Sequence, residues 1–151
     1  MELPAKEWDK SDTIPFDRSL LMCYNTGRLQ DPKTQNSILD FDDVEPYLRQ
    51  YHSSTLPRTD VAYPVYGWGV EFNKNGWFQR LINSHQLPEA LEKNKVQQVK
   101  IREEWGEPRA IRKTQRFLPI LDSLHTVILY HLDSCNLSKY RYEDIEKFYS
   151  R

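Results

Sequence analysis

A basic segment from Lys93 to Arg116 holds the side chains of this chain that are best suited to binding another molecule. Guanidinium and ammonium groups bind phosphate oxygens, and an exposed indole can stack on a base. The steps of three and four from Arg109 to Arg116 predict a basic ridge on one helical flank. The alternative is a solvated helix face. The candidate macromolecule-binding residues are Lys100, Arg102, Trp105, Arg109, Arg112, Lys113 and Arg116.

Residues with catalytic or metal-binding potential are otherwise dispersed. His125 and His131 are six positions apart, which places their rings on opposite faces of a helix and prevents them from sharing a metal. Cys23 lies in an apolar run and is expected to be buried. The acidic cluster around Asp42 and Asp43 lacks the glycine and final glutamate of a calcium loop, so helix capping explains it better. We predict no metal and no cofactor.

The composition predicts a folded, globular protein. It gives no sign of a general affinity for polyanions. Its 151 residues carry a formal net charge of -1, with 13% aromatic and 38% hydrophobic residues. Large aromatic side chains compensate for scarce aliphatic ones. Binders of nucleic acid or of membrane surfaces are usually more basic, so the whole-chain charge gives no support to either function.

The cysteines and the N-terminal residues predict the compartment. Cys23 and Cys135 are too few for a disulfide framework. The acidic N-terminus lacks the apolar stretch of a signal peptide, and no apolar run is long enough to span a membrane. We therefore expect a protein of the cytoplasm or nucleus with no membrane association.

The strongest helical pattern runs from Arg116 to Leu132, where apolar residues recur every three or four positions. It predicts a central core helix with Leu121, Leu124 and Ile128 at its middle. Further helices are predicted over 42–51 with Asp42 as the cap, over 77–85, from Pro108 onward, and after Ser138. In the last of these, the residues expected to face inward are Tyr142, Ile145, Phe148 and Tyr149.

Strands are predicted where apolar residues alternate. From Tyr66 to Phe72, aromatic and β-branched residues alternate with glycines, which predicts a strand with Trp68 and Val70 on its buried face. A turn follows over 73–76. Residues 19–24 predict a short buried strand, and residues 95–105 fit a strand or a helix equally well.

These patterns predict an α+β fold, in which a small antiparallel sheet from the N-terminal half packs against C-terminal helices. Residues 1–151 are expected to form a single domain, with 1–18 as a candidate extended arm. Because no catalytic constellation is visible, we expect a non-enzymatic interaction or accessory protein that binds another macromolecule, first of all another protein. Two alternatives stay open: a nucleic-acid-binding module using residues 93–116, and a small hydrolase or nuclease with dispersed Asp, Glu and His residues.

Overall fold

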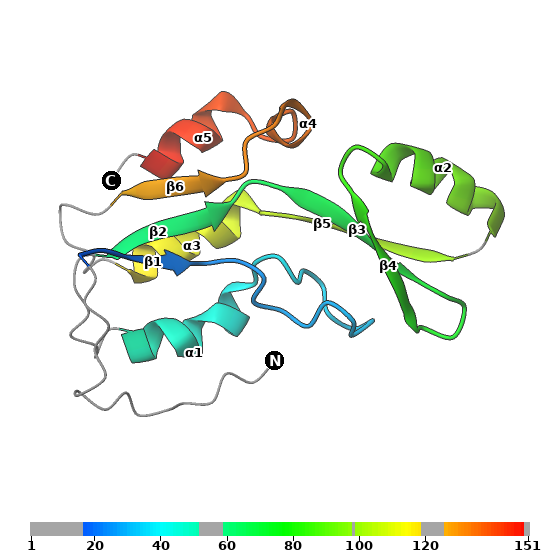
Figure 1. Ribbon diagram of the computed structural model, residues 1–151, viewed down its shortest axis with the longest axis horizontal. Coiled ribbons are helices and arrows are strands. Elements are labelled where there is room, and N and C mark those ends of the chain that lie inside the picture. The colour runs from blue at the N-terminus through cyan, green and yellow to red at the C-terminus, as the bar shows by residue number, and fades with distance from the viewer. Residues whose placement is uncertain (1–16, 52–58, 98, 119–125, 150–151) are drawn as a thin grey trace.

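The computed structural model describes residues 17–51, 59–97, 99–118 and 126–149, which form two three-stranded sheets with helices around them (Figure 1). The strands are β1 (Ser19–Met22), β2 (Thr59–Pro64), β3 (Gly67–Phe72), β4 (Phe78–Asn83), β5 (Lys100–Trp105) and β6 (Val127–Tyr130). The helices are α1 (Phe41–Tyr51), α2 (Leu87–Gln97), α3 (Pro108–Phe117), α4 (Ser134–Leu137) and α5 (Tyr142–Tyr149).

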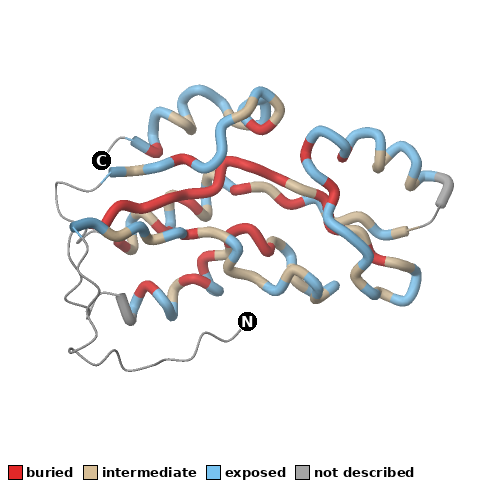
Figure 2. The backbone as a smooth tube through the Cα atoms, in the orientation of Figure 1, coloured by how far each residue is buried: buried red, intermediate tan, exposed pale blue. Residues whose placement is uncertain are grey.

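One sheet is parallel, with the strand order β1-β2-β6. Its register pairs Leu21 with Val61 and Val61 with Val127. Parallel neighbours need long crossover connections. Helix α1 lies in the first connection, and the whole antiparallel sheet lies in the second. Figure 2 shows the result: β2 is buried along its length between two more exposed strands.

The other sheet is antiparallel, with the order β4-β3-β5. A tight turn joins β3 to β4, in which the Asn73 side chain accepts hydrogen bonds from the backbone N–H groups of Asn75 and Trp77. Gly76 supplies the positive φ of +80° that this turn requires. The chain passes from β2 into β3 through Val65 and Tyr66 alone, so the two sheets are directly joined.

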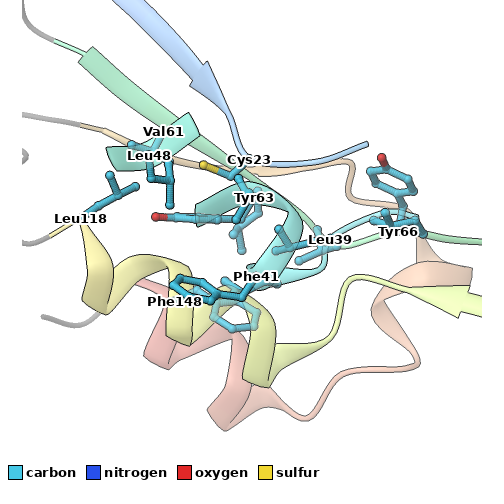
Figure 3. Close-up of a cluster of buried hydrophobic side chains, with 14 residues drawn as sticks. Cys23, Leu39, Phe41, Leu48, Val61, Tyr63, Tyr66, Leu118 and Phe148 are labelled. Carbon is cyan, nitrogen blue, oxygen red and sulfur yellow. The ribbon is translucent and has the colours of Figure 1, made fainter. Parts of the chain in front are cut away.

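The main hydrophobic core lies on one face of the parallel sheet. Val61 and Tyr63 of β2 and Leu129 of β6 face helices α1, α3 and α5 there. Figure 3 shows Leu48, Phe41 and Phe148 closing over Val61 and Tyr63 from these helices. Cys23 is fully buried in this core, which confirms the prediction, and its burial raises the pKa of the thiol to about 12.

The predicted α+β fold, with a small antiparallel sheet and C-terminal helices, is confirmed. Strand β3 covers the predicted segment, and Val70 is fully buried while Trp68 is half-buried against the core. Pro108 begins α3 as expected. The ambiguous segment before Gly106 forms helix α2 and then strand β5. Strand β1 is where it was predicted, but its residues alternate between half-buried and exposed.

The predicted long helix from Arg116 to Leu132 is wrong. Helix α3 ends at Phe117, and Val127–Tyr130 is strand β6. Four consecutive apolar residues fit a helix or a strand, and pairing with β2 selects the strand. Ile128 is 37% exposed and is therefore not a core centre. Leu121 and Leu124 lie outside the described residues.

Three further helix predictions need correction. Residues 78–83 form strand β4, because the turn after β3 closes a hairpin there. The first helix is capped by Asp40, whose carboxylate accepts from the Asp42 N–H, so Asp42 is not the cap. Ser138 ends α4 instead of starting the last helix. In α5, Phe148 is buried as predicted and Ile145 is half-buried, but the two tyrosines, Tyr142 and Tyr149, are exposed.

Candidate functional site

The parallel sheet has a second face, opposite the core, which we call the outer face. Side chains alternate along a strand, so the residues between the core positions point to this face. The register arranges them in rows across β1, β2 and β6. The middle row is Met22, Ala62 and Ile128. The row before it is Leu20, Asp60 and Thr126, and the row after it is Tyr24, Pro64 and Tyr130.

The two edge strands present large apolar side chains on the outer face. Leu20 is 49% exposed, Met22 59%, Ile128 37% and Tyr130 48%. No labelled helix lies in front of β2 in Figure 1. Parallel sheets are normally covered on both faces, and contiguous apolar patches on a protein surface mark sites of interaction. The outer face is therefore the first candidate site in the described part of the chain.

An aromatic cluster lies beside the outer face, where the three parallel strands end. The rings of Tyr24 and Tyr130 stack with centroids 5.6 Å apart, and the edge of Tyr66 meets both. The Tyr66 hydroxyl donates to Asn25 Oδ1 at 2.7 Å, and His131 stacks on the Tyr66 ring. Ligands of open parallel sheets bind at this carboxyl edge. No local pattern in the sequence indicates this cluster, because its members are far apart in the chain.

Asp133 lies next to this cluster between two histidines. Its carboxylate is 3.0 Å from His131 Nε2 and 3.8 Å from His85 Nε2. The backbone N–H of Asn136 donates to it at 2.8 Å, so Asp133 also caps α4. That hydrogen bond, with the Asn136 side chain and the two histidines, holds the pKa of Asp133 below its usual range.

The contacts of Asp133 are suited to fixing the orientation of a histidine ring more than to catalysing a reaction. A carboxylate that binds one imidazole nitrogen fixes the ring, as in hydrolytic enzymes. Neither His85 nor His131 is hydrogen bonded to a serine, threonine or cysteine among the residues described. The same residues contain no group of three His, Cys, Asp or Glu side chains able to hold a metal ion. Among the described residues, neither histidine is therefore paired with a nucleophile, as the hydrolase alternative would require.

The basic residues of α3 lie on one flank, but two of them bind acidic side chains of the same chain. Arg112 Nη1 donates to Asp144 of α5 at 2.9 Å. Lys113 Nζ donates to Asp42 of α1 at 3.2 Å and lies 4.0 Å from the Phe41 ring centroid. The other two, Arg109 and Arg116, are exposed. The flank thus docks α3 against neighbouring helices.

The remaining predicted residues lie on β5 and are separated from that flank. Lys100 begins β5 and is exposed. Arg102 is nearly buried; it pairs with Glu104 and donates to the carbonyl oxygens of Leu29 and Asp31. The half-buried Trp105 ring packs where a Cβ on Gly67 would lie, and Lys139 Nζ is 4.8 Å from its centroid.

The Arg102 side chain is nearly buried because it pairs with the buried carboxylate of Glu104. The Glu104 side chain is fully buried and accepts hydrogen bonds from the backbone and hydroxyl of Ser37, from the Trp68 indole and from Arg102. A buried carboxylate needs such donors because desolvation penalises its charge. Together these contacts tie the 25–39 loop to the antiparallel sheet.

Comparisons with known proteins add no assignment: no protein-family model, no curated protein and no solved structure matches this chain. Within the described ranges, no helix is long and apolar enough to cross a membrane.

Proposed function

We propose that this is a non-enzymatic interaction protein that binds another protein through the outer face of its parallel sheet. The observation that carries this proposal is the exposure of Leu20, Met22, Ile128 and Tyr130 on β1 and β6, the two strands that flank the buried strand β2. Removing apolar surface from water yields about 25 cal/mol per Å², so contact with a partner would be favourable for this face.

The character of the face favours protein over nucleic acid. Its middle row carries no charge, and the charge of Asp60 in the row before it is neutralised by an ion pair with Arg18. Phosphate binding needs several unpaired cations, whereas protein interfaces have apolar centres with tyrosine and methionine enriched. We also place this function in a reducing compartment, the cytoplasm or nucleus, because Cys23 and Cys135 are both free.

The test begins with a photo-crosslinking amino acid at Met22, and the control carries it at Trp77, which is 69% exposed in the turn before β4. A protein crosslinked only from position 22 is identified, purified and titrated against wild type, Met22→Glu and Trp77→Glu. We expect Met22→Glu to weaken binding at least tenfold, about 1.4 kcal/mol, and Trp77→Glu to leave it unchanged. Equal affinities of the three proteins would refute the proposal.

A further inference from the structure

We propose that His85, Asp133 and His131 form a pH-responsive latch at the junction of the two sheets, which is held more firmly when the two imidazoles take up protons. The junction is the place where the chain leaves the parallel sheet after β2 and enters the antiparallel sheet at Gly67, the first residue of β3. The latch is separate from the proposed protein-binding face, so its test needs no partner.

Asp133 lies between side chains that come from the two sheets. His85 is in the turn between β4 and α2, on the side of the antiparallel sheet, and its Nε2 is 3.8 Å from Asp133 Oδ1. His131 follows β6 of the parallel sheet, and its Nε2 is 3.0 Å from Asp133 Oδ2. The His131 ring also stacks on Tyr66 in the junction itself. One carboxylate therefore contacts an imidazole from each side of the junction.

Asn136 connects Asp133 to the backbone of the junction. Its Nδ2 donates to Asp133 Oδ2, and its Oδ1 accepts from the Gly67 N–H at 3.1 Å. Asn136 is 1% exposed, so water does not compete for these hydrogen bonds. Hydrogen bonds in such a network support one another. A carboxylate that is held more firmly therefore also holds the acceptor of the Gly67 N–H more firmly.

The charge on the two histidines determines how firmly Asp133 is held. The Asn136 N–H is the main reason why the pKa of Asp133 lies below its usual range, so this carboxylate stays ionised well below neutral pH. Imidazole side chains ordinarily change charge between about pH 5 and pH 8, and only a protonated ring forms an ion pair. The attraction is therefore present on the acid side of this range and is lost as the pH rises through it.

The titratable groups that the described residues place around His131 do not oppose this effect. The rings of Tyr66 and Tyr130 pack against the imidazole, and burial raises the pKa of Tyr66, whose hydroxyl stays uncharged. Glu104 is close enough to act on Tyr66, but its charge is neutralised by the ion pair with Arg102. Asp133 thus supplies the negative charge that His131 meets directly.

The surroundings of His85 add little charge, and the exposure of both histidines limits the size of the effect. Ser84 and Gln86, the neighbours of His85 in its turn, are uncharged, and Glu89 at the start of α2 is paired with Lys93. The His85 and His131 side chains are 62% and 52% exposed. Because water screens such pairs, we expect a several-fold effect on the opening of the junction.

Amide hydrogen exchange followed by NMR tests the latch at the Gly67 N–H, because exchange there reports local opening of the junction. We expect the protection factor of this amide, corrected for the intrinsic pH dependence of exchange, to be about threefold to tenfold higher at about pH 5.5 than at about pH 7.5. The internal control is the Val61 N–H, which donates to the Thr126 carbonyl near the other end of β2. Its protection should not change.

Two variants separate the charge of the latch from its contribution to the fold. His85→Gln/His131→Gln keeps polar side chains that cannot be protonated in this range, and Asp133→Asn keeps a helix cap without the charge. In both proteins, the protection of Gly67 should be the same at the two pH values. Of the single variants, His131→Gln should lose more of the pH effect than His85→Gln, because its nitrogen is closer to the carboxylate.

Equal protection of Gly67 at the two pH values in wild type would overturn the proposal. A pH effect of wild-type size in Asp133→Asn or in the double histidine variant would also overturn it, because the histidines would then not act through Asp133. A rise of the same size at Val61 would show that the whole fold responds to pH, and would refute a latch at the junction.

Discussion

Arg102 illustrates at the residue scale how burial changes the role of a basic side chain. It was a candidate for contact with a macromolecule, but its side chain is 10% exposed and ion-paired to the fully buried Glu104. Its other nitrogens hold the loop carbonyls of Leu29 and Asp31. A charge at this position contributes to the fold because the Glu104 carboxylate that it neutralises has no access to water.

We predict that Arg102→Met lowers the free energy of unfolding by about 3–5 kcal/mol, since it leaves the Glu104 carboxylate buried without its cation. The matched control is Arg80→Met, because Arg80 pairs with Glu71 while remaining 63% exposed. Pairs of that kind contribute about 0–1 kcal/mol. Urea denaturation of the three proteins measures both losses. Similar losses for the two variants would contradict the structural role of Arg102.

The lowered pKa values of three aspartates allow us to predict how the stability of the fold depends on pH. The Arg18 hydrogen bond lowers the pKa of Asp60, the Asn136 N–H lowers that of Asp133, and Arg112 lowers that of Asp144. A carboxyl whose pKa is lower in the folded state than in the unfolded chain stabilises the protein at any pH above the unfolded-state pKa of that carboxyl. That contribution is lost as the pH falls through the folded pKa.

We therefore expect the melting temperature to be level near neutral pH and to fall below about pH 4. Asp133→Asn is the informative variant, because asparagine caps helices as well as aspartate does but cannot be protonated in this range. Thermal melts from pH 7 to pH 3 should show a shallower acid decline for this variant. An acid decline as steep as that of wild type would rule out a contribution from Asp133.

Strand β3 is the critical element at the next scale, because it pairs with β4 on one side and β5 on the other. One alanine inserted after Gly69 would turn the following side chains to the opposite face. Val70 and Phe72, both fully buried, would lose their packing. We expect loss of cooperative unfolding in thermal melts followed by circular dichroism.

The control for this insertion is one alanine between Lys74 and Asn75, which lie exposed in the turn after β3. Loop tips accept insertions at small cost because no ladder has to shift. The turn variant should keep a cooperative transition. If the strand insertion melted at the same temperature as the turn insertion, β3 would not hold the register of its sheet.

For the molecule as a whole, the net charge of -1 and the internal pairing of α3 predict weak association with nucleic acid. At about 0.15 M salt, where screening acts over roughly 8 Å, we expect negligible binding to mixed RNA and DNA in fluorescence anisotropy. Micromolar binding that disappears in Arg109→Glu/Arg112→Glu/Arg116→Glu would contradict this, and would make the basic flank of α3 the leading site.

Local patterns in the sequence were sufficient for several elements. Alternation with glycines predicted β3, and Pro108 predicted the start of α3. The class of fold followed from the mixture of periods two and 3.6 along the chain. These features depend on neighbouring residues, whose steric and hydrogen-bonding preferences the sequence contains directly.

Contacts between distant segments decided the rest. Val127–Tyr130 is a strand because it pairs with β2, and the Thr126 N–H binds Asp60 across a separation of 66 residues. The same long-range packing buries Arg102 and leaves Met22 exposed, although composition and spacing suggested the opposite for both. A periodic pattern shows that a segment has an apolar side, but only the tertiary structure determines whether another segment covers it, because burial is a property of the assembled chain.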